Sequence, residues 1–175
     1  MSSSETRPIL KTKFRKADFI LEALAILALI ATWVFPVITY NSLANTIPTH
    51  FGLKGEADGW GSKSVIFLLP VINILLFTGL TILNKYPHKF NYPVKVTEEN
   101  AILLYNKGTR FLRILKVSVV LLFLLIESFI CSSSQYKQLP IWFLPLVLMV
   151  PVLLPIVLAF SFSPSFSSGK TSTQK

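Results

Sequence analysis

The side chains best suited to chemistry gather in one short segment between two apolar stretches. This segment carries an imidazole, two carboxylates, an indole and an ammonium group, which belong to His50, Glu56, Asp58, Trp60 and Lys63. One imidazole with two carboxylates, here His50, Glu56 and Asp58, is a ligand set that hard or borderline cations accept. The first hypothesis is therefore a weak metal site or a site for another ligand. The alternative is structural, with carboxylates bonded to turns, the indole at a membrane interface and the lysine beside a carboxylate.

Glu127 is a different kind of candidate, because it lies well inside an apolar segment. Four residues separate it from Cys131, so it lies about 6 Å from the near end of a helix. Acids within a membrane often face a cavity, a partner cation or a proton path. The structural alternative is a hydrogen bond to Ser128, to Ser132 or to a neighbouring helix, or a carboxyl group that stays protonated. Both interpretations remain open.

Membrane helices are the elements that must position these residues. Hydrophobic residues make up 52% and charged residues 14% of the 175-residue chain, a composition that is wrong for a soluble globule of this size. Four segments approach the roughly 20 apolar residues that a bilayer requires, namely 19–40, 64–83, 112–130 and 139–160. The alternating polar residues of a barrel strand are missing from them. We therefore predict an all-α integral membrane protein with four transmembrane helices.

Basic residues predict the orientation of these helices. Of the 17 lysines and arginines, all but Lys54, Lys63 and Lys137 lie before the first helix, around the second connection or in the tail. Because basic flanks favour the cytoplasm, both termini are predicted inside, with loop 41–63 outside and loop 84–111 inside. The predicted order is a basic cytoplasmic N-terminus (1–18), the transmembrane domain (19–160) and a disordered cytoplasmic tail (161–175).

The third helix is expected to begin before it enters the membrane. Thr97 is a suitable N-cap, and the residues that follow form a basic amphipathic lead that we expect to lie at the inner headgroups. Gly108 would mark the turn into the bilayer. We expect Arg113 and Lys116 to snorkel to the inner interface along their aliphatic stems.

Several classes of function are disfavoured by the sequence. The motifs GxSxG, GxxxxGK[ST] and HExxH do not occur in it, so we predict no enzyme activity and no cofactor. The net charge of +9 comes from residues that flank apolar segments, which argues against nucleic-acid binding. Cys131 is the single cysteine, and His88 is predicted on the opposite membrane side from His50. The expected partner is the lipid bilayer, and the oligomeric state is open.

The outer loop resembles the signature of a bacterial membrane domain of unknown function. The resemblance is carried by Ile47-Pro48-Thr49-His50-Phe51, Gly55-Glu56-Ala57-Asp58-Gly59-Trp60 and Ser62-Lys63, and further along by Asn91-Tyr92-Pro93-Val94 and Thr97-Glu98-Glu99-Asn100. This domain occurs in the SdpI-like family, which is named for immunity against a sporulation-delaying toxin. The resemblance implies a multi-pass protein of the bacterial cytoplasmic membrane with a role in immunity.

Two functional hypotheses follow. The first is non-enzymatic recognition of a toxin peptide or an envelope ligand through the outside loop, with the five residues named first as its contacts. The second is a small proton- or cation-coupled transporter, or an accessory subunit, that uses Glu127. Few further polar residues lie within the predicted helices, which favours recognition over conduction. A membrane hydrolase with a metal at His50 is a weaker alternative.

Cysteine labelling tests the predicted topology. In a chain with Cys131→Ser, a membrane-impermeant maleimide should label Ser62→Cys in intact cells and Lys95→Cys only after permeabilisation. Labelling in the reverse order would overturn both the orientation and the placement of the outer loop.

Overall fold

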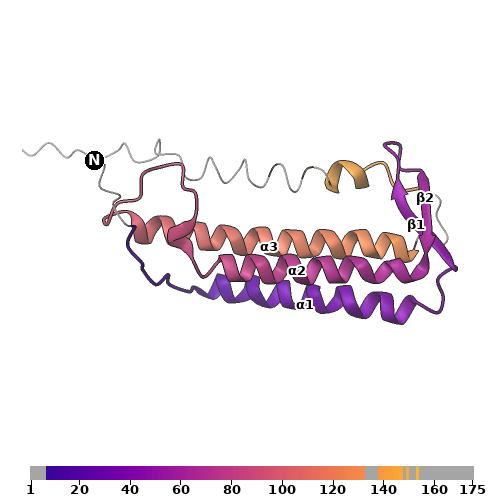
Figure 1. The fold of residues 1–175 in the computed structure, drawn as a ribbon, viewed down its shortest axis with the longest axis horizontal. Helices are drawn as coiled ribbons and strands as arrows, with labels where there is room; N and C mark the ends of the chain where they lie inside the picture. Colours follow the sequence, from indigo (N-terminus) through magenta and orange to yellow (C-terminus); the bar gives the residue numbers. More distant parts are fainter. Residues whose placement is uncertain (1–6, 133–137, 148, 150–152, 154–175) are drawn as a thin grey trace, which may run out of the picture.

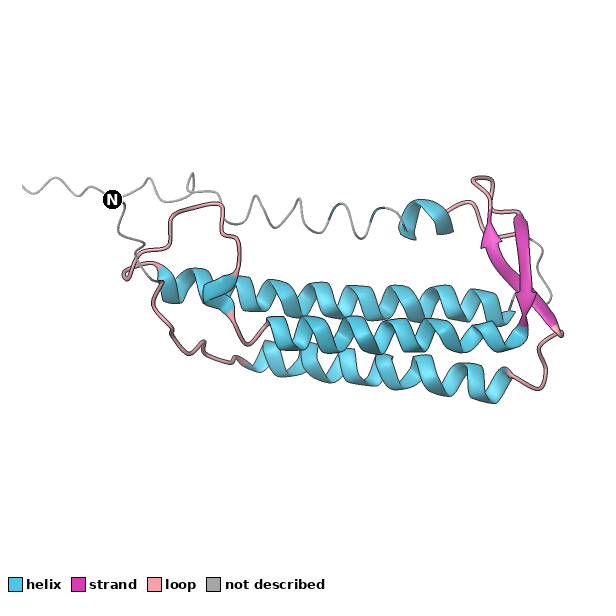
Figure 2. Cartoon of the chain, in the orientation of Figure 1, coloured by secondary structure: helices cyan, strands magenta, loops and turns pink. Residues whose placement is uncertain are grey.

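Three long helices and one hairpin form the computed structural model, which describes residues 7–132, 138–147, 149 and 153. The helices lie side by side along the long axis of the molecule, and the hairpin crosses one end of them (Figure 1; Figure 2). In chain order the elements are α1 (Lys16–Thr39), β1 (Thr46–Phe51), β2 (Ala57–Ser62), the 3-10 helix η1 (Lys63–Phe67), α2 (Leu68–Leu83), the 3-10 helix η2 (Pro87–Lys89) and α3 (Ala101–Ser132). We call the end with β1 and β2 the hairpin end, and the end with η2 the basic end.

The three long helices can each cross a membrane. By length and composition, α1, the continuous pair of η1 and α2, and α3 all qualify as spans. Their outward side chains are apolar, as Leu27 and Ile38 show with exposures of 64% and 69%, and lipid tails can cover such surfaces. Three of the four predicted helices are thus confirmed, and the chain is a small multi-pass membrane protein. Half of the residues of the fourth, 139–160, and all of the predicted tail lie outside the described residues.

The prediction of an all-α protein is wrong for the loop 41–63, because much of it forms an antiparallel hairpin. Hydropathy located the long spans, whose apolar runs are unmistakable, but strands of six residues leave little such signal. Glycine and Pro48 in these strands weaken the local preference for β structure further.

The basic end is built on an overhang of α3. With 32 residues, α3 is about 48 Å long, so its first turns extend beyond the roughly 30 Å of hydrocarbon. The apolar face of this lead does not lie on headgroups as predicted, because Tyr92 and Val96 of the preceding loop pack against Leu104 and Tyr105. The helix also continues through Gly108, where a Cβ would lie 2.8 Å from the Tyr92 hydroxyl oxygen. Gly108 therefore permits close packing and does not turn the chain.

The segment before α1 is fastened to the same overhang. Arg7 Nη1 donates to the Phe90 carbonyl at 2.7 Å, and the Tyr105 hydroxyl donates to the Pro8 carbonyl at 3.0 Å. The Tyr92 hydroxyl also donates to a loop carbonyl at 3.0 Å, and burial raises the pKa of this group. It therefore stays protonated at neutral pH and keeps donating.

Ion pairs between α1 and α3, and a hydrogen bond to α2, join the three helices just inside the basic end. Lys116 Nζ donates to Glu22 Oε2 on α1 at 2.6 Å and to Thr81 Oγ1 on α2 at 3.0 Å. Arg113 Nε lies 3.3 Å from Glu22 Oε1, and its guanidinium carbon lies 4.1 Å from the centroid of the Phe14 ring. One carboxylate of α1 is thus shared by two cations of α3.

A second carboxylate of α1 completes this group. Asp18 Oδ1 accepts from Arg110 Nε at 3.2 Å and lies 3.7 Å from Arg113 Nη1. Asp18 Oδ2 accepts from the backbone N–H of Arg15 at 2.8 Å, so the carboxylate also closes the first turn of α1. We call the five charged residues the ion cluster, namely Asp18, Glu22, Arg110, Arg113 and Lys116.

The prediction that Arg113 and Lys116 snorkel to the interface is wrong. Their side chains are only 4% and 2% exposed, and both reach carboxylates of α1. On α1 the two carboxylates are four residues apart, and on α3 successive cations are three residues apart. Both spacings place side chains on one face of a helix, so the two sets face each other. The two cations thus pair with carboxylates inside the bundle and do not extend to the lipid headgroups.

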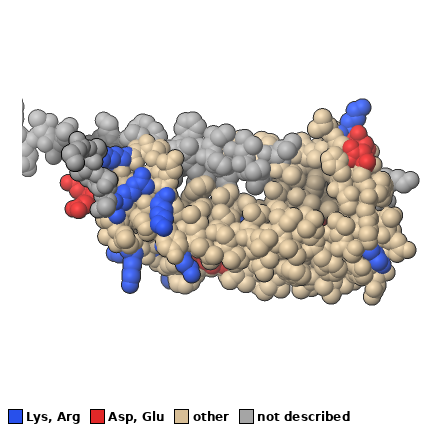
Figure 3. Space-filling model, viewed as in Figure 1, with Lys and Arg blue, Asp and Glu red and all other residues tan. Residues whose placement is uncertain are grey.

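Charge is unevenly distributed over the surface. Figure 3 shows most blue side chains at the basic end and a small mixed group of red and blue at the hairpin end, with few charged side chains between them. Exposed residues on the long helices between the ends include many large apolar ones. This division of the described residues agrees with a bundle whose middle lies in lipid.

Removal of one carboxylate should destabilise the bundle. Glu22→Gln leaves Lys116 buried without its anion, a change that typically costs about 3–5 kcal/mol. We expect a clear fall in the midpoint of thermal unfolding in detergent, and recovery in Glu22→Gln with Lys116→Met. Glu98→Gln, which alters an exposed carboxylate at the same end, serves as the control. Equal midpoints for Glu22→Gln and the control would show that the ion cluster does not stabilise the bundle.

Candidate functional site

The hairpin is closed by a turn that requires glycine. The Gly55 N–H donates to the Gly52 carbonyl at 2.9 Å, and the Gly52 N–H donates to the Glu56 carbonyl at 2.8 Å. Gly55 has a φ of 81°, a conformation that L side chains rarely adopt. The turn brings β1 and β2 into register, with Thr46 opposite Ser62 and irregular pairing around His50.

Two contacts fix the hairpin to the rest of the protein. On one side, Ile47 is buried with Leu43, Ile66 and Cys131, which joins β1 to η1 and to the end of α3. On the other, the N–H of Leu139 donates to the Gly55 carbonyl at 2.8 Å. The last part of the described chain therefore returns to the tip of the hairpin, which makes the hairpin a supported platform.

Three of the five predicted site residues come together on this platform. His50 Nδ1 and Asp58 Oδ1 form a hydrogen bond of 2.5 Å, and the two side chains are 73% and 46% exposed. A Cβ added at Gly52 would lie 2.7 Å from Glu56 Oε1 and 3.3 Å from Asp58 Oδ2, so both carboxylates lie over the Gly52 backbone. Gly59 leaves room for the imidazole, since a Cβ there would lie 2.8 Å from His50 Cβ.

The other two predicted site residues have different surroundings. Trp60 lies on the same exposed face of β2 as Asp58, because exposure alternates along this strand, and it is 53% exposed. Lys63 does not neutralise a carboxylate, which was one structural interpretation of its place in the sequence. Its ammonium group donates to the Tyr40 carbonyl at 3.4 Å and lies 4.7 Å from the centroid of the Tyr40 ring. Lys63 thus joins η1 to the end of α1.

The site contains no ready metal centre. Among the residues that the structure describes, no three His, Cys, Asp or Glu side chains form a group that could hold a metal ion. His50 and Asp58 are already hydrogen-bonded to each other, and Glu56 lies beside them. What the platform offers is hydrogen bonding and negative charge. The helix η2, which carries His88, and the strand β1, which carries His50, lie at opposite ends of the bundle (Figure 1). That the two histidines face opposite sides of a membrane stays a prediction.

Exposed apolar side chains surround this polar group. Leu53 at the hairpin tip is 96% exposed, and Ile141 and Trp142, in the segment that returns to the tip, are 93% and 51% exposed. Trp142 is held at the hairpin end by the Phe129 ring of α3, with centroids 5.6 Å apart. The hairpin end therefore combines carboxylates with large apolar groups, a composition typical of a recognition surface or a membrane interface.

The bundle interior holds a second candidate site. Glu127 and Asn73 are both 0% exposed, and Thr32 is 1% exposed. The carboxylate oxygens of Glu127 and the amide atoms of Asn73 have no hydrogen-bond partner among the described residues. The Thr39 hydroxyl reaches Cys131 Sγ at 3.4 Å, and this contact, with the one between Lys116 and Thr81, sets the register of the helices. At about 1.5 Å per residue, this register places the three buried polar residues at similar heights along the bundle axis, within about one helical turn.

Sequence reasoning missed part of the ion cluster and of the interior site. Asp18 was not singled out, and Asn73 was counted only among the few polar residues of the predicted helices. The pair of Asp18 and Glu22 has helical spacing that matches the cations on α3. That spacing was the available signal. The bond between Gly55 and Leu139 had no signal in the sequence, because it joins residues far apart along the chain.

Comparison with known proteins identifies the family of this chain but indicates no activity. Residues 27–74 match the domain of unknown function DUF1648, a range that includes the hairpin and extends from within α1 to within α2. The chain is 30% identical over 159 residues to an uncharacterized protein of Archaeoglobus fulgidus, which covers 83% of this chain and 86% of that relative. No solved structure matches the chain. The chain therefore belongs to the same family as this archaeal protein and contains a DUF1648 domain.

Proposed function

We propose that this DUF1648-containing membrane protein is a non-enzymatic receptor whose hairpin binds a peptide or an envelope component. The observation that carries the proposal is the accessible group of His50, Glu56 and Asp58 on a supported hairpin. The hydrogen bond between His50 and Asp58 orients both side chains before a ligand arrives. Such preorganisation reduces the entropy that binding must remove.

The charge of the hairpin favours a cationic ligand. Glu56 and Asp58 outnumber the single cation of the hairpin, Lys54, although the whole chain has a net charge of +9. Carboxylates accept charge-assisted hydrogen bonds from ammonium and guanidinium groups. Leu53 and Trp60, both exposed, would contact apolar side chains of the same ligand. A cationic amphipathic peptide satisfies both requirements.

The resemblance of the loop to SdpI-like proteins supports an immunity or sensing role for this receptor. Under that proposal the protein resides in a bacterial cytoplasmic membrane, with the hairpin outside, where a toxin peptide would first meet it. The excess of basic residues at the opposite end agrees with this orientation.

Substitutions on the hairpin test the receptor. For the protein in zwitterionic nanodiscs, we expect His50→Ala and Asp58→Ala each to weaken binding of a labelled synthetic peptide of lysine and leucine by about tenfold. Loss of one charge-assisted hydrogen bond, about 1.5–3 kcal/mol, accounts for such a change. Fluorescence anisotropy provides the measurement. Glu98→Gln, a carboxylate change at the basic end, should bind as the wild type does, and unchanged affinity in both hairpin variants would refute the proposal.

A second candidate function rests on the buried acid. Glu127 and Asn73 have no hydrogen-bond partner among the described residues, and buried acids in membranes commonly serve ions or protons. A small transporter or accessory subunit would use Glu127 to carry a proton or a cation across the bundle. Glu127, Asn73 and Thr32 lie at one level of the bundle, and the ion cluster, another buried polar group of the described residues, already pairs its charges internally, which makes recognition the better supported function.

Flux measurements distinguish this candidate. If Glu127 carries protons, proteoliposomes should show a pH-driven flux that Glu127→Gln reduces by at least tenfold, because the amide cannot exchange a proton. Ser118→Ala, a polar substitution on the same helix, should leave the flux intact. Equal flux through wild type and Glu127→Gln would eliminate the transporter.

A further inference from the structure

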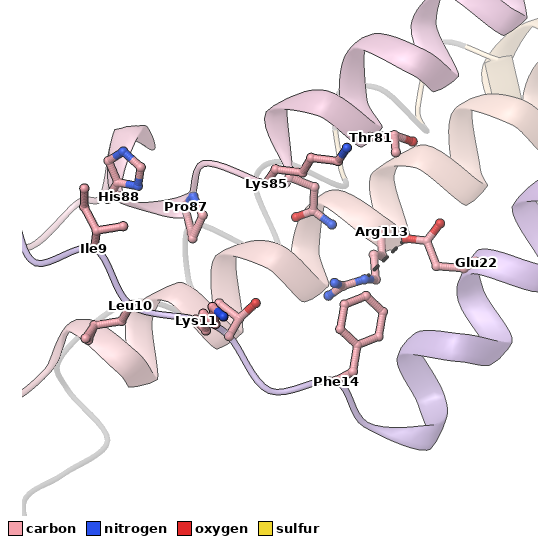
Figure 4. Close-up of a pocket in the computed structure, with 12 residues that line it drawn as sticks. Ile9, Leu10, Lys11, Phe14, Glu22, Thr81, Lys85, Pro87, His88 and Arg113 are labelled. Carbon is pink, nitrogen blue, oxygen red and sulfur yellow. Dashed lines mark ion pairs between the residues drawn. The ribbon is translucent and has the colours of Figure 1, made fainter.

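We propose that a cavity at the basic end binds a phosphate group, presented there by the headgroup of an anionic phospholipid. The cavity has a volume of about 550 Å³. It lies between the segment that precedes α1, the end of α2 with η2, and α3 (Figure 4). This volume falls within the range of roughly 300–1,000 Å³ that small-molecule sites occupy. The cavity lies at the opposite end of the bundle from the hairpin, so its ligand is independent of the proposed receptor.

The charges that line the cavity favour an anion. Lys11, Lys85 and Arg113 contribute three cations, and Glu22 is the one carboxylate among the lining residues. Glu22 is already paired with Lys116 at 2.6 Å and with Arg113 at 3.3 Å. Neither Lys11 nor Lys85 forms an ion pair with a described residue. Two ammonium groups are therefore available to a ligand, and phosphate is an anion that such groups bind well.

The apolar lining explains why the anion would belong to a lipid. Ile9, Leu10 and Phe14 line the cavity, and their side chains are 80%, 38% and 51% exposed. Figure 4 shows Phe14 beside the Arg113 guanidinium, on the side of the cavity formed by the N-terminal segment. These side chains lie next to the start of α1, a membrane-spanning helix that lipid acyl chains would surround. A ligand with a phosphate and hydrocarbon chains contacts both kinds of surface.

Two polar atoms of the lining residues, Asn84 Oδ1 and Arg113 Nε, lack a hydrogen-bond partner among the described residues. Of these, the side-chain oxygen of Asn84 is a buried acceptor. An unsatisfied buried acceptor is unfavourable unless a ligand or a water supplies a donor. A headgroup hydroxyl, as in a glycerol headgroup, is a suitable donor. The phosphate would then lie near Lys11 and Lys85, with the hydroxyl directed to Asn84.

Binding to the purified full chain in neutral detergent tests this site. The probes are short-chain phosphatidylglycerol, short-chain phosphatidylcholine and inorganic phosphate, measured by isothermal titration. We expect saturable binding of phosphatidylglycerol, and at least a tenfold loss of affinity in Lys11→Gln with Lys85→Gln. Lys89→Gln is the matched control, because Lys89 lies on η2 with its ammonium group 5.0 Å from the Tyr86 ring centroid and does not line the cavity.

The three probes distinguish the sources of the phosphate. Tight binding of phosphatidylglycerol, with weak binding of the other two, supports a lipid site. If inorganic phosphate binds as tightly as phosphatidylglycerol, and the double variant loses this binding, the cavity is a phosphate site whose ligand is a soluble anion. Absence of saturable binding, or equal affinity in wild type, double variant and control, overturns the proposal.

Discussion

Neutralisation of buried charge between α1 and α3 is the condition on which the rest of the bundle depends. Two carboxylates on α1 meet three cations on α3 at a depth where side-chain exposure is 4% or less for Arg113, Lys116 and Asp18. An unpaired charge in such surroundings would force the helix end out toward water. Because the pairs are satisfied, α3 can keep a polar turn beside α1. The two helices then remain parallel as far as the contact between Thr39 and Cys131 at the hairpin end.

The protein has two polar ends, and the ion cluster lies near one of them. At the basic end, the ion cluster neutralises Glu22 and leaves Lys11 and Lys85 without ion pairs to described residues. At the hairpin end, the chain exposes Asp58 and His50 on a platform that the bundle supports. A surface with few charged side chains and many exposed apolar ones separates the two ends (Figure 3). Ligands of opposite charge are therefore expected at opposite sides of the membrane.

Most of the helical fold could be predicted from the sequence, because long apolar runs identify spans without reference to tertiary contacts. The hairpin could not, since Gly55 acquires its partner Leu139 only after the chain has crossed the membrane twice more. In the candidate site, the contact between His50 and Asp58 could be predicted, because both residues occur in one short segment. The ion pair of Lys116 could not be predicted, because snorkelling and pairing are equally favourable until the position of Glu22 is known.

The ion cluster also sets a requirement for how the protein is made. Arg110 follows Asp18 by 92 residues, and Lys116 follows Glu22 by 94. At about 5–20 residues per second, the carboxylates of α1 leave the ribosome roughly 5–20 seconds before their cationic partners. During that interval the two carboxylates of α1 lack their cationic partners on α3. The ion cluster can therefore form only late in synthesis, after α3 has been made.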